Sequence, residues 1–413
     1  MALDQVGLDG LAAGPHDSDL YIRLGRHIFG WDSRGSYGLF RMGPGYGFIL
    51  AILRLFFGSS PIWPILFNVI MGALASALVY LLAYLLLKSR AVALVAGGIS
   101  ALSLTSVSLS CLILNDQPFF TIHLAALVCF VQGYRSGRTK WYLYAGLLAG
   151  FAAYVRPVGQ VLPWVFFALA LILPVSLGHT SRLDLIRRAG ITGLVMLLMI
   201  GAWSVRNYAV NDRFVFGSNG VLTVRTYLIA RVAAKTWNEK KGIRAYQSEW
   251  IKEDGDYAGD YVVAYDKARD RIFREIKGAP GAVAETYYDI LKKNLVAANF
   301  MALRFVPSIK PFVKTINDEM TVWLGYVLFF LSLAGLALMV LRRRMAAALI
   351  LGITYVTFSL LLGLSYWQGS RLHYPAEMAW SIMLAFLMVE PFRYFKTLWQ
   401  LRRAAGPSGR TLR

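Results

Sequence analysis

Long apolar runs separated by short polar segments dominate the pattern of this chain. A helix needs about 20 apolar residues to cross a bilayer. Nine runs approach or exceed this length, at 61–87, 91–110, 117–133, 141–155, 158–178, 189–205, 321–341, 346–366 and 376–392. We therefore predict an all-α polytopic membrane protein. Arg156-Pro157 separates the fourth run from the fifth, because proline ends the helical hydrogen-bond ladder. These two runs can therefore form a short re-entrant pair.

Composition supports a membrane protein. Hydrophobic residues make up 57% of the 413 residues and charged residues only 16%, against about 25% in soluble domains. A net charge of +20 can indicate nucleic acid binding, but that function needs a basic face on a soluble fold. Here the charge lies in short loops, so no nucleic-acid partner is expected.

The loop charges predict the orientation. One set of loops, together with the C-terminal tail, carries seventeen lysines and arginines, whereas the opposite short loops carry only Arg156 and Arg371. Because positive loops stay in the cytoplasm, we predict a multi-pass protein of the inner (plasma) membrane. Residues 1–60 form an extracytoplasmic first loop, 206–320 an extracytoplasmic helical insert and 393–413 a basic cytoplasmic tail. The transmembrane helices occupy 61–205 and 321–392.

An extracytoplasmic first loop requires a hydrophobic helix before it. The run Gly43 to Gly58 is too short to span and contains Arg54. We therefore expect that a first transmembrane helix is missing from the chain as given.

The polar stretch GPHDSDLYIRLGRHIFGW stands near the start of this apolar chain. Apolar residues recur in it at helical spacing, at Leu20, Leu24, Ile28 and Trp31, which predicts an amphipathic helix in the outer interface. Asp17 and Asp19 stand at its beginning. An aspartate before a helix is a favoured N-cap, so one of the two can cap while the other does chemistry.

Several short motifs follow in a recognisable order. They are Asp17-x-x-x-Tyr21, Arg41-x-x-Pro44-Gly45-Tyr46, Asp116 in ILNDQP, Arg156-Pro157, Arg206 in WSVRNY and, more weakly, Arg371 and His373 in RLHYPAE. This succession resembles the C-type superfamily of membrane glycosyltransferases, in particular the group of protein O-mannosyltransferases and the lipid A aminoarabinose transferase. Two features depart from the family pattern: the arginine–proline spacing is one residue longer, and residue 116 is Asp where Glu is common.

The resemblance implies a transmembrane helix bundle with interfacial helices and a reaction on the extracytoplasmic (periplasmic) side. Such enzymes transfer a sugar from a polyprenyl phosphate (undecaprenyl or decaprenyl phosphate) to an acceptor hydroxyl, which needs a carboxylate base. The motif match makes Asp17 the base, with Asp19 as the alternative and Asp116 as a second carboxylate. Cations would stabilise the lipid phosphate, and the candidates are Arg41, Arg156, Arg206, Arg371 and His373. Tyr21 and Tyr46 would line the substrate site.

Each candidate also has a simpler interpretation. An outer-face arginine can bind lipid head groups or snorkel, Asn-Asp is a common turn, and interfacial tyrosines need no function. No cofactor is certain. A divalent metal is possible but not required, with Asp17, Asp19, Asp116 and His373 as hard ligands.

Two other functions compete with sugar transfer. A polysaccharide polymerase or ligase acting on lipid-linked glycans would rely on basic residues in a large outer loop. A lipid or solute transporter would place ionisable residues at mid-membrane. The only Asp, Glu, Lys or Arg residues within the predicted spans are Glu377 and Glu390, which lie near the two ends of the last span. The expected partners are a lipid-linked sugar, an acceptor lipid, glycan or protein, and the bilayer. The sugar, the acceptor and the oligomeric state stay open.

Overall fold

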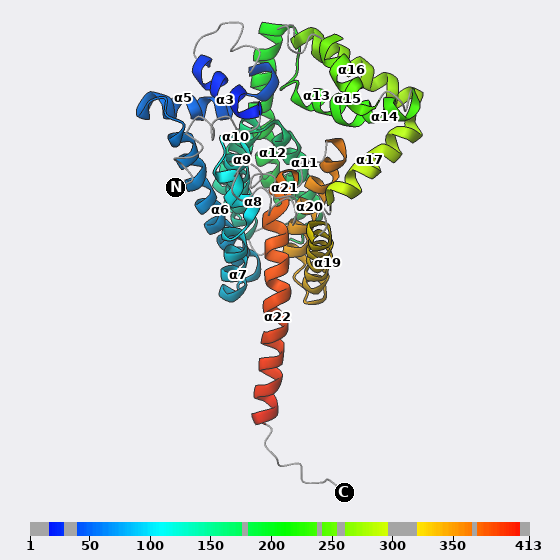
Figure 1. Ribbon diagram of the computed structural model, residues 1–413. Helices are drawn as coiled ribbons and strands as arrows, with labels where there is room; N and C mark the ends of the chain where they lie inside the picture. The colour runs from blue at the N-terminus through cyan, green and yellow to red at the C-terminus, as the bar shows by residue number, and fades with distance from the viewer. Residues whose placement is uncertain are drawn as a thin grey trace, which may run out of the picture.

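The computed structural model describes residues 16–28, 39–175, 181–237, 242–253, 261–295, 320–365 and 370–404. All regular structure within these ranges is helical, which confirms the predicted all-α class. The helices form a bundle, with the N-terminal helices and the polar insert at one end and the last helix extending from the other (Figure 1).

Helix α9 (Asp116–Ser136) lies at the centre of the N-terminal half of the bundle. It packs against α6 (Ile62–Leu87) and α10 (Thr139–Val155), and α10 packs in turn against α12 (Arg182–Asn211). Small residues along α10 are completely buried, among them Ala145, Ala149 and Ala152. Small side chains let helix backbones approach closely, which is how helices associate inside a membrane.

Three described helices are long and apolar enough to cross a membrane: α6, α12 and residues 345–364. Residues 345–364 comprise α20 (Met345–Leu361) and the short η5 (Leu362–Leu364). The pair α7 (Arg90–Ala101) and α8 (Leu104–Ser110), bent by 51° at its junction, forms a fourth if it counts as one span. The chain is thus a membrane protein, and helices occupy each of the nine predicted runs.

The break predicted at Arg156-Pro157 is present. Helix α10 ends at Val155, Arg156 has extended backbone angles, and Pro157 starts a 3-10 turn, η1 (Pro157–Val161), that leads into α11 (Leu162–Ile172). The missing amide hydrogen of proline explains the end of α10. Arg156 therefore stands at a fixed corner between two helices.

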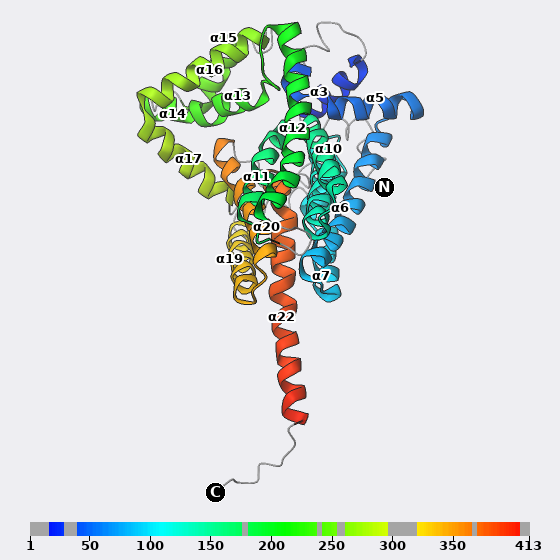
Figure 2. The ribbon, with the colours of Figure 1, turned by 180° about the vertical axis from the view of Figure 1, so that it is seen from behind.

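Two helices precede the bundle and lie across its end. Helix α3 (His16–His27) buries Tyr21 and Leu24, and Ile28 directly after it is also buried, which confirms the predicted amphipathic helix. Helix α5 (Gly45–Phe57) packs against α3 and lies across the end of α6 in both opposite views (Figures 1 and 2). The predicted N-cap needs correction, because α3 already begins at His16 and places both aspartates in its first turn. Trp31 lies outside the described residues.

The described parts of the insert are helical, as expected. Its elements are α13 (Asn219–Val224), the π-turn η2 (Arg225–Ile229), α14 (Ala230–Thr236), α15 (Ile243–Glu253), α16 (Tyr261–Gly278) and α17 (Pro280–Leu295). It has a small core of its own around Ile229, Tyr246, Trp250 and Ile290. Helix α17 runs from this core back to the bundle (Figure 2).

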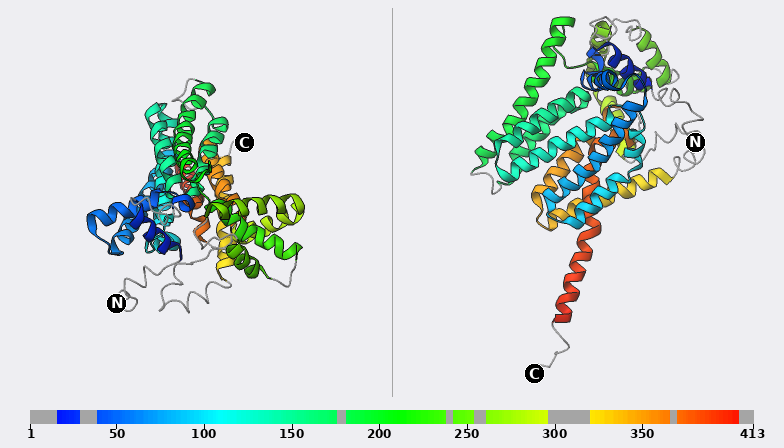
Figure 3. Two further views of the ribbon diagram at one scale, coloured as in Figure 1. Left: turned by 90° about the horizontal axis from the view of Figure 1, so that it is seen from above. Right: turned by 90° about the vertical axis from the view of Figure 1, so that its left-hand side faces the viewer.

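The C-terminal helices complete the bundle. They are α19 (Met320–Leu341), α20, the short turns α21 (Ser370–His373) and η6 (Tyr374–Ala376), and α22 (Glu377–Ala404). The first part of α22 packs against α7 and α19, and its second part extends away from the other helices (Figures 1 and 3). The loop segment with α21 and η6 touches both α8 and α9.

Candidate active site

The candidate site is built around Asp116, the first residue of α9. The residue before it, Asn115, donates a hydrogen bond from Nδ2 to the carbonyl oxygen of Val155 at 2.8 Å. Val155 is the last residue of α10, so this bond ties the start of α9 to the corner that carries Arg156. The local structure therefore sets Asp116 beside Arg156, although 40 residues separate them.

Two arginines hold the Asp116 carboxylate. Arg156 Nη1 contacts Oδ1, while Arg371 Nε and Nη2 each lie 3.0 Å from Oδ2. The Asp116 side chain is 0% exposed, and those of Arg156 and Arg371 are 17% and 14% exposed. We call these three residues the Arg–Asp–Arg triad. All three are candidate site residues predicted from the sequence motifs, and the structure brings them together.

The electrostatics of the triad favour a charged carboxylate. Burial by itself raises the pKa of Asp116, but the positive charges and hydrogen bonds of Arg156 and Arg371 outweigh burial and hold this pKa below its usual range. Three fixed charges then leave one net positive charge at a partly buried place. A guanidinium carries five N–H donors in a planar fork that suits phosphate oxygens. Such a triad is suited to bind an anion.

A buried polar network continues from the triad. The Tyr374 hydroxyl donates to Gln117 Oε1 at 2.6 Å and pairs with Ser106 Oγ at 3.0 Å. Glu377, the first residue of α22, is 2% exposed. Tyr374 and Glu377 were not predicted from the sequence, in which the acidic residue at the end of RLHYPAE was the available signal.

The Arg41–Tyr46 segment packs against the same corner. Gly45 lies so close to the end of α10 that a Cβ there would meet the Tyr154 carbonyl carbon and the Val155 nitrogen at 2.6 Å. The ring of Tyr46 makes an edge-to-face contact with Tyr21, with centroids 5.0 Å apart. Their exposed fractions, 1% and 3%, place both tyrosines in the protein core, so both rings support the segment from inside.

Other candidates occupy different surroundings. The Arg206 guanidinium lies over the Trp203 ring, 5.1 Å from its centroid, and donates to Asn207 Oδ1 at 2.9 Å. The Arg41 side chain is partly buried. The His373 ring donates from Nε2 to the carbonyl oxygen of Asn294, in α17. Asp17 and Asp19 belong to α3, but their side chains lie outside the described part of the chain.

The described residues contain no group of three or more His, Cys, Asp or Glu side chains that could hold a metal ion. Both oxygens of Asp116 contact arginine nitrogens. Asp116 in this arrangement therefore offers a cation no uncommitted oxygen.

One family model matches part of the chain. Residues 41–203 match the family model described as dolichyl-phosphate-mannose-protein mannosyltransferase. No curated protein sequence matches the chain.

Solved structures match over most of this chain. The oligosaccharyltransferase AglB from Archaeoglobus fulgidus, in complex with an inhibitory peptide and a dolichol-phosphate, has a TM-score of 0.53 and 14% identity over 94% of this chain and 47% of its own. A structure of the Archaeoglobus fulgidus oligosaccharyltransferase with zinc and sulfate has a TM-score of 0.51 and 16% identity, over 93% of this chain and 46% of its own.

ArnT from Cupriavidus metallidurans, bound to undecaprenyl phosphate, has a TM-score of 0.40 and 15% identity, over 89% of this chain and 71% of its own. The chain spans about half the length of the oligosaccharyltransferases that it matches. The predicted resemblance is thus confirmed: the chain has the fold of the C-type membrane glycosyltransferases, and its residues 41–203 match the protein mannosyltransferase family of that superfamily.

Proposed function

We propose that the protein is a glycosyltransferase that moves one sugar from a polyprenyl phosphate to a hydroxyl group of a lipid, glycan or protein. The reaction takes place on the extracytoplasmic face of the inner membrane. The observation that carries the proposal is the Arg–Asp–Arg triad, in which a buried carboxylate holds two arginines side by side. The match to a family described by a lipid-phosphate sugar donor supports it.

The reaction needs two kinds of group. The acceptor oxygen forms a bond to the anomeric carbon while the bond from that carbon to the phosphate oxygen breaks, and a carboxylate takes the hydroxyl proton. The polyprenyl phosphate leaves with one more negative charge than it had in the donor. Fixed cations that meet this charge as it develops lower the barrier. Arg156 and Arg371 fill this role in our proposal.

Asp116 positions the arginines in this scheme. Both its oxygens are engaged and its pKa is held low, so it is a weak proton acceptor. The base is then Asp17 or Asp19, which occupy the first turn of α3. Helix α3 packs against α5, and α5 packs against α10 next to Arg156.

Binding of the lipid phosphate tests the arginine roles without knowledge of the acceptor. Purified full-length protein in detergent is titrated with undecaprenyl phosphate, and the dissociation constant is measured for Arg156→Gln and Arg371→Gln. A hydrogen bond to a charged group contributes about 1.5–3 kcal/mol, so each variant should bind about tenfold to a hundredfold more weakly. The control is Arg213→Gln, which removes another arginine paired with an aspartate, Asp266, in the insert.

The phosphate role is refuted if Arg156→Gln and Arg371→Gln bind undecaprenyl phosphate as tightly as the Arg213→Gln control does.

The base is tested separately, by single turnover of a labelled polyprenyl-phosphate sugar with Asp17→Asn and Asp19→Asn. The variant that keeps lipid-phosphate affinity but loses transfer identifies the base. If both variants transfer at the rate of the unmodified protein, neither aspartate is the base.

A further inference from the structure

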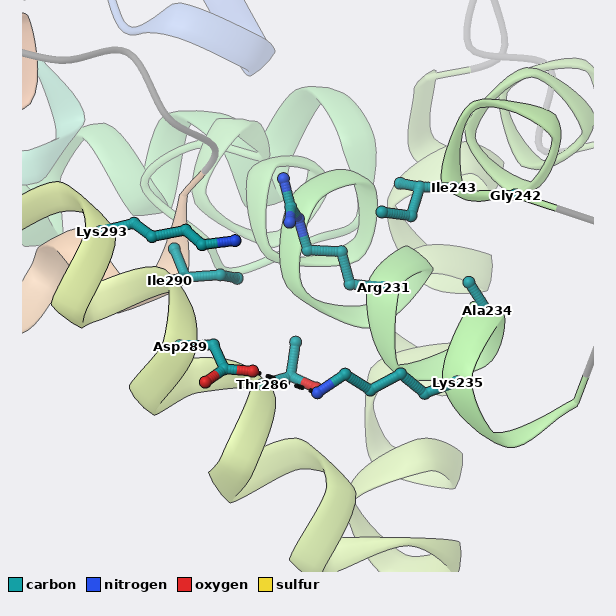
Figure 4. A pocket seen from close by; sticks show the side chains of 9 residues that line it. All are labelled: Arg231, Ala234, Lys235, Gly242, Ile243, Thr286, Asp289, Ile290 and Lys293. Atoms are coloured by element: carbon teal, nitrogen blue, oxygen red, sulfur yellow. Dashed lines mark hydrogen bonds and ion pairs between the residues drawn. The ribbon is translucent and has the colours of Figure 1, made fainter. Parts of the chain in front are cut away.

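A second polar site lies in the insert. A pocket of about 390 Å³ opens between α14, the start of α15 and α17 (Figure 4). Its size falls within the range of small-molecule sites, about 300–1,000 Å³. We call it the insert pocket. It is lined by Arg231, Ala234, Lys235, Gly242, Ile243, Thr286, Asp289, Ile290 and Lys293.

Positive charge dominates the lining. Lys235 Nζ lies 3.2 Å from both Glu285 Oε1 and Asp289 Oδ2, so its charge is balanced locally. Within the described part of the chain, Lys293 has no ion-pair partner. The charged ends of Lys293 and Arg231 point into the same space between α17 and α14 (Figure 4). Lys293 therefore brings into the pocket a positive charge that no described acidic side chain pairs with, and an anion bound there would compensate this charge.

The pocket also contains an unused hydroxyl. Thr286 is 1% exposed, lines the pocket from α17 and has no hydrogen-bond partner for Oγ1. Buried hydroxyl groups are nearly always hydrogen-bonded. A ligand with hydroxyl groups or anionic oxygens would satisfy Thr286 Oγ1 and Lys293 together.

The insert pocket is joined to the triad through α17. Asn294 is next to Lys293. Its Nδ2 donates to the carbonyl oxygen of Leu362 at 2.9 Å, and its backbone carbonyl oxygen accepts the hydrogen bond of His373. His373 stands two residues after Arg371. From Thr286 to Asn294 α17 rises about 12 Å, at about 1.5 Å per residue. A chain of two or three sugar units extends over this distance.

We propose that the insert pocket binds an anionic sugar unit of the acceptor, one that carries a carboxylate or a phosphate group. The acceptor is then an acidic glycan that lies along α17 with its reactive hydroxyl at the triad. Its role as acceptor rests on the proposed function, whereas the binding of an anionic sugar by this pocket does not.

Binding by full-length protein in detergent tests the inference. The probes are a trisaccharide of uronic acids, a phosphorylated maltotriose and neutral maltotriose, each titrated at low salt. We expect at least one anionic probe to bind at least tenfold more tightly than maltotriose. For that probe, Lys293→Gln should weaken binding about tenfold, since it removes one charge-assisted hydrogen bond. Thr286→Val should weaken it several-fold.

The matched control is Lys292→Gln, because Lys292 is the adjacent exposed lysine of α17 and does not line the pocket. It should bind like the unmodified protein. Two results overturn the inference: equal binding of neutral and anionic probes, or equal effects of Lys292→Gln and Lys293→Gln. Which anionic probe binds decides between carboxylate and phosphate.

The two proposals fail separately. Loss of anionic-probe selectivity with normal undecaprenyl phosphate binding refutes only the insert pocket. Normal pocket binding combined with an intact lipid-phosphate affinity in Arg371→Gln refutes only the donor role of the triad.

Discussion

Asp116→Asn is the most informative single substitution. It keeps the size of the side chain but removes the charge that compensates Arg156 and Arg371, which are only 17% and 14% exposed. Removal of one partner from a buried ion pair costs about 3–5 kcal/mol, because the remaining charge stays buried without compensation. We expect a loss of stability in this range, as well as weaker binding of undecaprenyl phosphate, since the two arginines lose the group that positions them.

The insert supplies a matched control. Asp266 receives three hydrogen bonds from Arg213, at 3.2 Å to Oδ1 and at 3.1 and 2.6 Å to Oδ2, but the Arg213 side chain is 37% exposed. Exposed pairs contribute about 0–1 kcal/mol, so Asp266→Asn should change stability little and lipid-phosphate binding not at all.

Thermal unfolding and titration of undecaprenyl phosphate, both on purified protein in the same detergent, give the two measurements. The reasoning is refuted if Asp116→Asn behaves like Asp266→Asn in both. If Asp116→Asn loses stability but keeps its affinity, Asp116 is a structural residue and the positioning role is wrong.

Three further changes test the surroundings of the site. Gly45→Ala should destabilise the protein by about 1–3 kcal/mol, because its Cβ would meet backbone atoms of α10 at 2.6 Å. Gly98→Ala, in open space within α7, should not destabilise it in the same unfolding measurement, and the better helix propensity of alanine can add up to about 1 kcal/mol. Asn68→Leu should cost about 1–3 kcal/mol in thermal unfolding, because Nδ2 no longer donates to the Leu112 and Leu114 carbonyls. Burial lowers the pKa of His373 to about 4, and the hydrogen bond to Asn294 offsets only part of this effect. The imidazole of His373 therefore binds a proton more readily in the unfolded chain than in the folded protein. The contribution of His373 to stability should therefore be full above about pH 6.5 and fall toward pH 4. The free energy of unfolding of His373→Gln should depend less steeply on pH, and an unchanged slope would contradict this assignment.

Local rules were sufficient for the helices of this chain. Apolar length placed helices on all nine runs, proline chemistry placed the end of α10 at Val155, and the apolar spacing of 20–28 gave the buried face of α3. Each of these features depends on residues close together in the sequence. Fold class and element positions could therefore be predicted from the sequence.

The contacts of the site depend on residues far apart. The spacing of ILNDQP and RLHYPAE contains no information that 116 and 371 form an ion pair, because only the packing of α21 and η6 against α8 and α9 brings them together. The resemblance to known enzymes supplied these residues. It gave no indication that Tyr46 lies inside the core or that His373 bonds to the insert, since both contacts depend on the direction of a side chain in the folded protein.

The triad also sets an order of events during synthesis. Asp116 and Arg156 leave the ribosome early, whereas Arg371 follows 255 residues after Asp116. At about 5–20 residues per second this interval lasts roughly 10–50 seconds. During that time the carboxylate has one of its two arginines, and the proposed lipid-phosphate site is incomplete. Under this proposal, a nascent chain gains the ability to hold its donor only when the segment before α22 has been made.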